Sequence, residues 1–459
     1  MLEKRLIERV LGIAVSSGAD FAELFCERTR NGRISLRNDM IDSISDETVS
    51  GVGIRAFRGV STVYGSTSDI TPAGLEKCAR AVAEAIGEVK EAGHVVLTER
   101  IFPNIHPVKV APTTADMQYK TDLLRRACTS ARGYDKRIVQ ATGALITADR
   151  TVWIANTEGL YTSDRHIRTR LATSAIASNG SENQSGTSSP GRGMGLEMFD
   201  TILPEDIGMT AAKQAVTNLE ADYCPAGKMP VAIENGFGGV IFHEACGHSL
   251  EATSVGTGCS QMCGKLGEMI AGEKVTAIDD GTIAGAWGSV NIDDEGHPTS
   301  RNVLIENGVL KNYMIDRLGS RRMNMPATGC GRRESYLYEP TSRMTNTFID
   351  NGPDKNEDII ASMDYGLYAK TMGGGSVNPL TGAFNFAVTE GYIVRNGKIC
   401  EPVRGASLIG TGSEILKDID MVGQNLAFGQ GMCGSSSGSV PTDVGQPLIR
   451  VSKITVGGR

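Results

Sequence analysis

The pattern of apolar and polar positions divides the chain into two regions near residue 225. The first region opens with helical periodicity from Glu3 to Ser17. Short strand-like runs follow, separated by Gly, Asn and Asp. A second helix is predicted to begin at Thr71, with Pro72 as its first residue, because this pair is a favourable helix start.

The rest of the first region mixes helices with longer alternating stretches. Helices are predicted over residues 115–132 and 204–220, and alternation over 137–178 predicts antiparallel strands. Residues 178–195 are rich in Gly, Ser and Asn, so we predict a mobile loop. Such loops often form lids, although simple surface excursions are commoner.

The second region contains one predicted helix, near residues 237–252, among many short alternating runs bounded by glycine. Asn-Gly pairs between apolar runs are hairpin signals. The runs are GSVNID, RNVLIENGVLKNYMID, TNTFIDNG, YGLYAKTMGGG, FNFAVTEGYIVRNGKI and GASLIGTG. They predict a largely antiparallel sheet or barrel-like region that carries the single helix.

The chain is therefore predicted to be an α+β protein. We expect an N-terminal domain over residues 1–224 and a β-rich C-terminal domain over residues 225–459. The length of 459 residues, 40% hydrophobic content and 22% charged content suit a folded protein of two to four domains.

Charge and hydropathy exclude several classes of protein. A formal net charge of -7 and a pI near 5.6 argue against a dedicated nucleic-acid binder. We find neither a signal-type hydrophobic stretch near the start nor a run of about 18 apolar residues, so we expect a cytoplasmic protein without a membrane partner. The ten cysteines are too sparse for a disulfide framework.

The stretch FHEACGHSLE places His243, Glu244 and His248 close together. The usual zinc-protease pattern has its histidines four apart, whereas these are five apart and would diverge by roughly 140° on a regular helix. Two distortions would make the spacing usable. One is a π-bulge, and the other is a break of the helix at Gly247 that brings His248 in from non-helical backbone.

These residue types suit a catalytic zinc site. Neutral imidazoles are good zinc ligands, and zinc makes a water molecule more acidic. Glu244 would then take the proton and pass it to a leaving amine. The alternative is that His243 and His248 satisfy local polar groups while Glu244 faces solvent.

A third protein ligand is expected to be a cysteine, and the spacing leaves the choice open. Cys246 lies inside the motif but should point elsewhere. Cys259 and Cys263 have the spacing of a structural metal pair, and with the two histidines they would close a four-ligand site. Cys433 lies on a Gly and Ser rich segment, predicted to be a loop, that could approach a metal closely.

Several long motifs resemble the TldD side of the TldD/PmbA family of zinc metallopeptidases, also labelled modulators of DNA gyrase. The match covers almost all of the second region and is looser in the first, at SGVGIRAFRG. The motifs are HEACGHSLEA, DDEGHPTSRNVLIENGVLKNYMIDR, GRRESYLYEPTSRMTNTFI, GGGSVNPLTGAFNFAVTEGYIVRNGKICEPVRGASLIGTG and the late MCG.

The resemblance implies that His243, His248 and Cys433 hold Zn2+ and that Glu244 is the general base. It also implies a homodimer, or a heterodimer with a PmbA-like subunit. PmbA-like members lack the histidine motif, so its presence favours the catalytic type. After Cys433 this chain reads CGSSSGSVP, where family members have a lysine-containing CGKxGQ-like run.

Two further groups are candidate substrate-binding residues. Gly373, Gly374 and Gly375 would let a peptide add as an extra strand, although a tight turn is an equal interpretation. Arg332 and Arg333 would bind a peptide terminus or an oxyanion, and a structural ion pair is the alternative.

The sequence thus predicts a cytoplasmic zinc-dependent peptidase acting on peptides or unfolded segments. A function of another class stays open. The chain would then be a non-catalytic binding or regulatory subunit that keeps a metal for stability.

Overall fold

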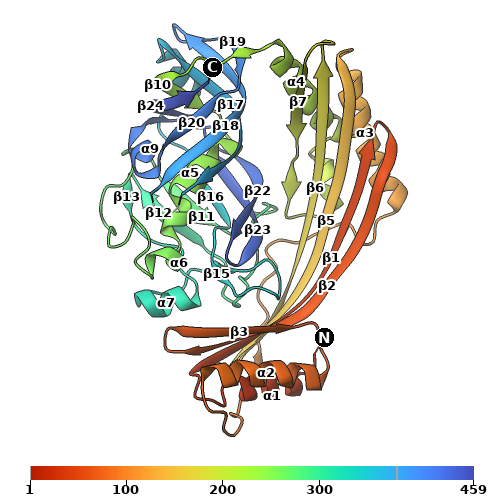
Figure 1. Cartoon of the computed structure of the whole chain (residues 1–459), viewed down its shortest axis with the longest axis vertical. Helices are drawn as coiled ribbons and strands as arrows, with labels where there is room; N and C mark the ends of the chain where they lie inside the picture. The colour runs from red at the N-terminus through yellow and green to blue at the C-terminus, as the bar shows by residue number, and fades with distance from the viewer. Residues whose placement is uncertain (1, 379–380, 459) are drawn as a thin grey trace.

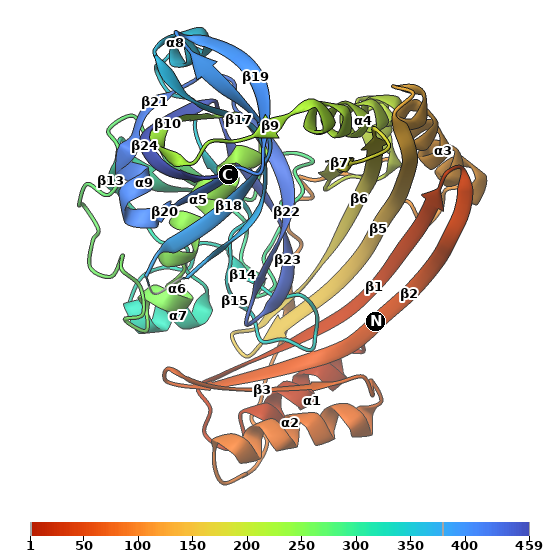
Figure 2. The ribbon, with the colours of Figure 1, turned by 45° about the horizontal axis from the view of Figure 1, so that its top comes forward.

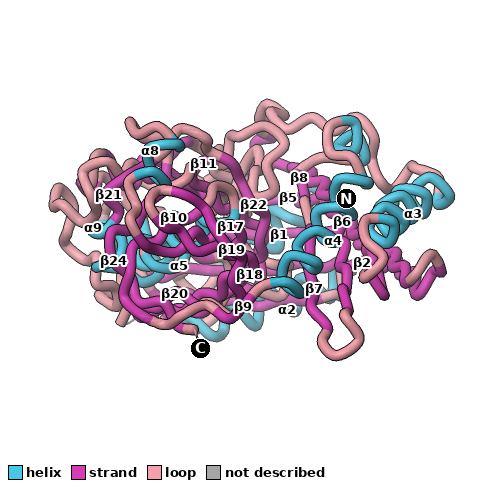
Figure 3. Tube along the Cα trace, turned by 90° about the horizontal axis from the view of Figure 1, so that it is seen from above, coloured by secondary structure: helices cyan, strands magenta, loops and turns pink. Residues whose placement is uncertain are grey.

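A computed structural model describes residues 2–378 and 381–458. The chain forms an N-terminal half dominated by long curved strands and a C-terminal half of shorter strands around a few small helices (Figure 1). Seen from above, the two halves lie side by side (Figure 3). The mixed architecture confirms the α+β fold class predicted from the sequence.

The N-terminal half is an eight-stranded sheet with the order β3-β2-β1-β5-β6-β4, and β7 and β8 both pair with β6. Its four longest strands pair antiparallel and curve together across the molecule (Figure 2). The strands are β1 (Phe21–Arg37), β2 (Met40–Arg58), β3 (Ser61–Thr67), β4 (Thr98–Glu99), β5 (Ile138–Asn156), β6 (Leu160–Ser178), β7 (Asn183–Ser188) and β8 (Gly191–Arg192).

Two helix pairs cover this sheet, one at each end, and each pair has its own hydrophobic core. The predicted helix start at Thr71 is confirmed, since its side-chain oxygen accepts a hydrogen bond from Gly74 N at 3.2 Å. The helices are α1 (Lys4–Ala14), α2 (Pro72–Ile86), α3 (Met117–Gly133) and α4 (Pro204–Glu220), with a 3₁₀ turn η1 (Leu196–Asp200) before α4.

The mobile loop predicted over residues 178–195 is wrong, because this segment contains the strands β7 and β8, which both pair with β6. The small residues serve close packing instead. A Cβ at Gly186 would lie 2.2 Å from the carbonyl oxygen of Ala211 in α4, so only glycine lets the helix approach this strand.

The C-terminal half contains a closed five-stranded barrel and an open sheet. The barrel runs β17-β10-β24-β20-β18 and closes by pairing β17 with β18, while β19, β9 and β21 extend it. These strands are β9 (Asp222–Tyr223), β10 (Gly227–Ile233), β17 (Tyr365–Val377), β18 (Ala383–Arg395), β19 (Lys398–Arg404), β20 (Ser407–Thr411), β21 (Ile419–Val422) and β24 (Ile449–Gly457).

The open sheet has the order β13-β12-β11-β16-β23-β22, and a separate short pair joins β14 to β15. These strands are β11 (Ala277–Asp280), β12 (Arg301–Glu306), β13 (Val309–Leu310), β14 (Gly331–Arg332), β15 (Thr341–Ser342), β16 (Asn346–Ile349), β22 (Ala427–Ser435) and β23 (Gly438–Gln446).

Short helices lie among these strands, and one hydrophobic core joins the central helical segment to the barrel and to the open sheet. They are the 3₁₀ turns η2 (Phe237–Gly239) and η3 (Gly247–Leu250), and the helices α5 (Val240–Ala245), α6 (Ala252–Val255), α7 (Arg317–Met323), α8 (Asn356–Ala361) and α9 (Gly412–Asp418).

Two predictions for the C-terminal half had different outcomes. The Asn-Gly hairpin signals are confirmed at Asn307-Gly308 and Asn396-Gly397, where all four residues have positive φ, as a type I′ turn requires. The strand predicted over GSVNID is wrong, because residues 288–293 are buried but irregular. Some of their polar groups bond to the N-terminal sheet, as when Asn291 Nδ2 donates to Asp164 Oδ1 at 2.8 Å.

A buried network of charges joins the two halves. Arg55 of β2 is fully buried and pairs with Glu23 of β1 and with Glu295 from the C-terminal half. Arg333 donates from Nη2 to the other oxygen of Glu23 at 2.8 Å. The two guanidinium charges hold the pKa of Glu23 below its usual value, although burial opposes this shift.

Candidate metal centre

The FHEACGHSLE segment is a broken helix. Helix α5 ends at Ala245, Cys246 departs from helical geometry with φ -134° and ψ -42°, and the 3₁₀ turn η3 continues from Gly247. Of the two distortions predicted from the histidine spacing, the structure has the break and not the π-bulge.

Glycine at the break allows a close contact with a neighbouring side chain. A Cβ at Gly247 would lie 2.4 Å from the sulfur of Met344, closer than a real carbon atom can approach. The small residue therefore lets η3 lie directly against the Met344 side chain, in the segment that leads into β16.

His243, His248 and Cys433 come together although Cys433 is 190 residues from His243. Cys433 Sγ lies 3.2 Å from His243 Nε2 and 3.4 Å from His248 Nε2. The predicted loop around Cys433 is wrong, because the cysteine lies within strand β22, paired with Val440 of β23.

The other ring nitrogen of each histidine has a partner of its own. His243 Nδ1 lies 3.1 Å from Thr347 Oγ1 of β16, and His248 Nδ1 lies 3.1 Å from Glu251 Oε2. Thr347 and Glu251 were not identified from the sequence. Glu251 lies in the FHEACGHSLE stretch, three residues after His248, and Thr347 lies in the GRRESYLYEPTSRMTNTFI motif. Neither pattern indicated a contact with a histidine.

Electrostatics favour a thiolate at Cys433. Burial raises the pKa of this thiol, but the charge and hydrogen bonds of His243 and His248 outweigh burial and lower it to about 3. Burial lowers the pKa of His248, yet Glu251 and Cys433 raise it well above its ordinary value. A thiolate is the form of cysteine that binds metals.

Glu244 lies beside this cluster and is partly exposed. Its side chain is 25% exposed, and its Oε2 is 3.7 Å from His248 Nε2. The carboxylate is therefore partly open to solvent and lies close to one of the three donor atoms.

The other cysteine candidates lie elsewhere. Cys246 is fully buried, and burial raises its pKa to about 12. Cys259 and Cys263 each contact a backbone carbonyl oxygen. Across residues 2–378 and 381–458, the one His, Cys, Asp and Glu group with metal-holding spacing is His243, His248 and Cys433, so Cys259 and Cys263 do not close a four-ligand site.

Gly373, Gly374 and Gly375 lie in strand β17, so the tight-turn interpretation is wrong. Here β17 pairs with β18 through an irregular register. Past Ala369, no strand of the described residues pairs with the other edge of β17. The backbone of this stretch is therefore open on one side.

Arg332 and Arg333 are buried and bonded within the protein. Arg332 Nη1 donates to the carbonyl oxygen of Met344 at 2.6 Å, and Arg333 makes the structural ion pair with Glu23. Contact of either side chain with a substrate stays a prediction.

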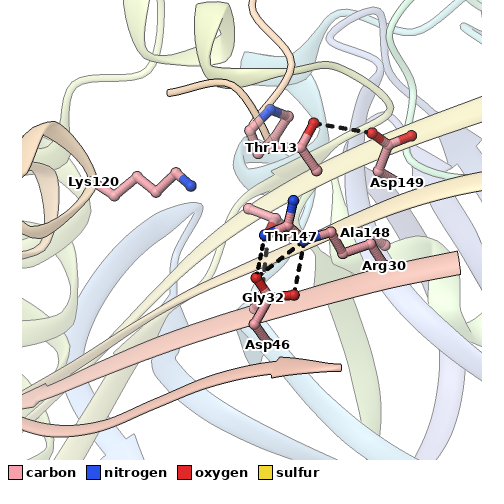
Figure 4. A pocket seen from close by; sticks show the side chains of 9 residues that line it. Arg30, Gly32, Asp46, Thr113, Lys120, Thr147, Ala148 and Asp149 are labelled. Atoms are coloured by element: carbon pink, nitrogen blue, oxygen red, sulfur yellow. Dashed lines mark hydrogen bonds and ion pairs between the residues drawn. The ribbon is translucent and has the colours of Figure 1, made fainter. Parts of the chain in front are cut away.

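A separate pocket lies between the N-terminal sheet and α3, and its charges are mostly paired (Figure 4). Arg30 binds Asp46 through two nitrogens, and Thr113 donates to Asp149 at 3.2 Å. None of the residues that line it belongs to the His243, His248 and Cys433 group.

Comparison with known families covers most of the chain. Residues 226–458 match the PmbA/TldA metallopeptidase C-terminal domain, residues 111–219 the central domain and residues 22–86 domain 1. The chain belongs to the TldD/PmbA metallopeptidase family.

Individual proteins similar to this chain are also named as TldD homologues. The chain is 35% identical to a Haemophilus influenzae protein named metalloprotease TldD homolog, over 100% of this chain and 97% of that one. It is 31% identical to a Saccharolobus solfataricus protein named zinc metalloprotease TldD homolog, over 57% of this chain and 58% of that one.

A solved structure shares the fold. It comes from Thermotoga maritima and is titled as a modulator of a DNA gyrase. It has a TM-score of 0.80 and 23% sequence identity, and the alignment covers 99% of this chain and 100% of that one. At this identity the likeness concerns the fold alone.

Proposed function

We propose that this chain is a zinc-dependent peptidase that hydrolyses peptide bonds in peptides or unfolded segments. The observation that carries the proposal is the convergence of His243 Nε2, His248 Nε2 and Cys433 Sγ, all within 4.8 Å of one another. The name of the Saccharolobus relative, a zinc metalloprotease, supports the choice of metal.

The donor set suits zinc. Ligands that lie about 2.0–2.3 Å from one zinc ion are roughly 3.3–3.8 Å from one another, close to the 3.2 and 3.4 Å between the imidazole nitrogens and Cys433 Sγ. Three protein ligands leave a fourth position open, as in catalytic sites. Bound zinc would supply Lewis acidity, which acidifies water and polarises a carbonyl group.

In this proposal Glu244 is the general base. Its carboxylate accepts a proton from the attacking water and delivers it to the leaving amine nitrogen. The partly exposed position of Glu244 supports this role, because the water molecule and the substrate can both reach its carboxylate from solvent. Thr347 and Glu251 keep the Nε2 atoms of the two histidines turned toward Cys433.

The open edge of β17 at Gly373–Gly375 supports recognition of an extended peptide. A substrate strand would pair there through main-chain hydrogen bonds, which depend little on side-chain identity. The three glycines place no Cβ in the way of an approaching backbone.

Further parts of the proposal concern the protein's context. We infer a cytoplasmic protein that pairs with a second copy or with a PmbA-like subunit, and a domain boundary at residues 224/225. Within the described residues, no helix has both the length and the apolar character to cross a membrane.

The test is metal analysis combined with cleavage of an unfolded protein substrate. The proposal expects about one zinc per chain, and Glu244→Gln should abolish cleavage while zinc stays bound. Zinc binding with equal cleavage by wild type and Glu244→Gln would refute the assigned base. Zinc binding without any cleavage would favour the regulatory-subunit alternative.

A further inference from the structure

Arg343 is a fully buried residue that follows strand β15 and contacts the segment carrying Cys433. Its Nη2 donates a hydrogen bond to the backbone carbonyl oxygen of Cys433 itself. Its Nη1 donates to Ser437 Oγ and to the Gly438 carbonyl oxygen, both at 2.9 Å. One guanidinium group thus bridges the two strands of the β22–β23 hairpin.

Other polar contacts hold the tip of this hairpin against the same part of the chain. Thr341 Oγ1 and Ser437 Oγ are 2.9 Å apart, and Ser439 N donates to Glu334 Oε2 at 2.7 Å. The Ser437 side chain is completely buried. The position of Cys433 therefore depends on residues that precede β16, far from it in sequence.

The Arg343 guanidinium also lies near Glu251, the residue that contacts the candidate ligand His248. Arg343 Nε is 3.9 Å from Glu251 Oε1, and neither atom has a hydrogen-bond partner within the described residues. The other oxygen of Glu251 contacts His248 Nδ1 at 3.1 Å. A buried charge without a countercharge is costly, so Arg343 and Glu251 stabilise each other across this short gap.

We propose that Arg343 is a positioning residue for the metal centre. It fixes Cys433 through the cysteine's own carbonyl oxygen and orients His248 through Glu251. The inference rests on the proposed function, in that the three donors bind a metal. It adds that one buried arginine aligns two of the three ligands, which come from opposite ends of the C-terminal half.

Lysine at this position keeps the charge but loses the planar fork that reaches three acceptors at once. Full-length wild-type protein and Arg343→Lys are titrated with Co2+, and the thiolate-to-cobalt absorption band reports binding through Cys433. We expect Arg343→Lys to weaken Co2+ binding by about 10- to 100-fold, the usual effect of losing an outer partner of a ligand.

The matched control is Arg168→Lys. Arg168 is also buried and donates to backbone carbonyl oxygens, those of Trp287 at 2.8 Å and Ser289 at 3.4 Å, but it contacts none of the three ligands. We expect both variants to lower the thermal midpoint of the metal-free protein, and only Arg343→Lys to weaken Co2+ binding. Equal losses of affinity in the two variants would make Arg343 merely structural.

The route through Glu251 is tested by combining Arg343→Lys with Glu251→Gln. If the arginine acts partly through the carboxylate, the combined loss of Co2+ affinity is smaller than the product of the separate losses. A loss of Co2+ affinity in the double variant that equals the product of the two separate losses overturns this part of the inference.

Two further outcomes are distinguishable. If Arg343→Lys does not fold, Ser437→Ala removes one acceptor of the fork and should weaken Co2+ binding several-fold, and unchanged binding overturns the inference. Absence of the thiolate band in wild type would refute the proposed metal centre itself. A wild-type band that Arg343→Lys leaves unchanged in strength and affinity would refute only the role of Arg343.

Discussion

His248 Nδ1 lies 3.1 Å from Glu251 Oε2, and this contact decides which nitrogen of the imidazole faces Cys433. With Nδ1 held at the carboxylate, Nε2 faces the sulfur of Cys433, 3.4 Å away. The two ring nitrogens of His243 also have separate partners, Thr347 for Nδ1 and Cys433 for Nε2. Both rings are thus oriented before any ion arrives.

The first prediction concerns Glu251→Gln. The amide can still accept a hydrogen bond from His248 Nδ1 but carries no negative charge, so the imidazole becomes a weaker ligand. We expect zinc affinity to fall by about 10-fold or more, measured by competition with a chromophoric chelator. Glu244→Gln is the control, since its zinc affinity should stay near that of wild type. Unchanged affinity in Glu251→Gln would show that the carboxylate does not support His248.

The second prediction concerns Gly247→Ala. The added methyl group would meet Met344 Sδ at 2.4 Å, so either the Met344 side chain or η3 must shift within the buried core. We expect a loss of about 1–3 kcal/mol in unfolding free energy and a lower zinc content after purification. Gly133→Ala is the matched control, because a Cβ there meets nothing within 4 Å. Comparable losses in the two variants would contradict the steric explanation.

The third prediction concerns the charges between the two halves. Glu23→Gln leaves Arg55 and Arg333 buried with one countercharge fewer. We expect a loss of about 3–5 kcal/mol in unfolding free energy by denaturant titration. Asp46→Asn, which breaks the solvent-exposed pair with Arg30, should have a far smaller effect. Equal unfolding free energies of Glu23→Gln and Asp46→Asn would contradict the stabilising role of the buried charges.

The fourth prediction concerns pH. Burial raises the pKa of Asp164, but His166 and hydrogen bonds such as that from Asn291 lower it to about 2. Because the folded pKa lies below the unfolded value of about 3.9, the stabilisation is present above pH 4 and is lost as the pH falls toward 2. It amounts to about 2–3 kcal/mol at neutral pH.

Asp164→Asn lacks this titration. Its unfolding free energy should therefore lie below that of wild type at pH 7, and the difference should shrink when both proteins are measured at pH 3.5. A difference that stays constant between the two pH values would assign the effect of the substitution to packing and not to charge.

Local chemistry in the sequence determined much of the scaffold. Helices α1, α2 and α4 and strands β5 and β6 follow from periodicity within each segment, and the Asn-Gly turns follow from the few residues that tolerate positive φ. The histidine motif was visible because its residues are neighbours along the chain.

Long-range packing decided what local pattern could not. Gly186 and Gly247 look like signals of flexibility, yet each lets another segment approach closely. The segment predicted as a loop at 178–195 therefore contains the paired strands β7 and β8. Cys433 was predicted to lie in a loop for the same reason, because the glycines of β22 hide its strand character.

The alignment of the candidate ligands belongs to the tertiary structure alone. The resemblance to a family pointed to Cys433, but spacing along the chain left Cys246, Cys259 and Cys263 as alternatives. Distances between residues far apart in sequence depend on how sheets and helices pack, and a pattern read along the chain contains no such distance. The sequence therefore supplied the donor atoms, and the packing of α5, β16 and β22 brought them together.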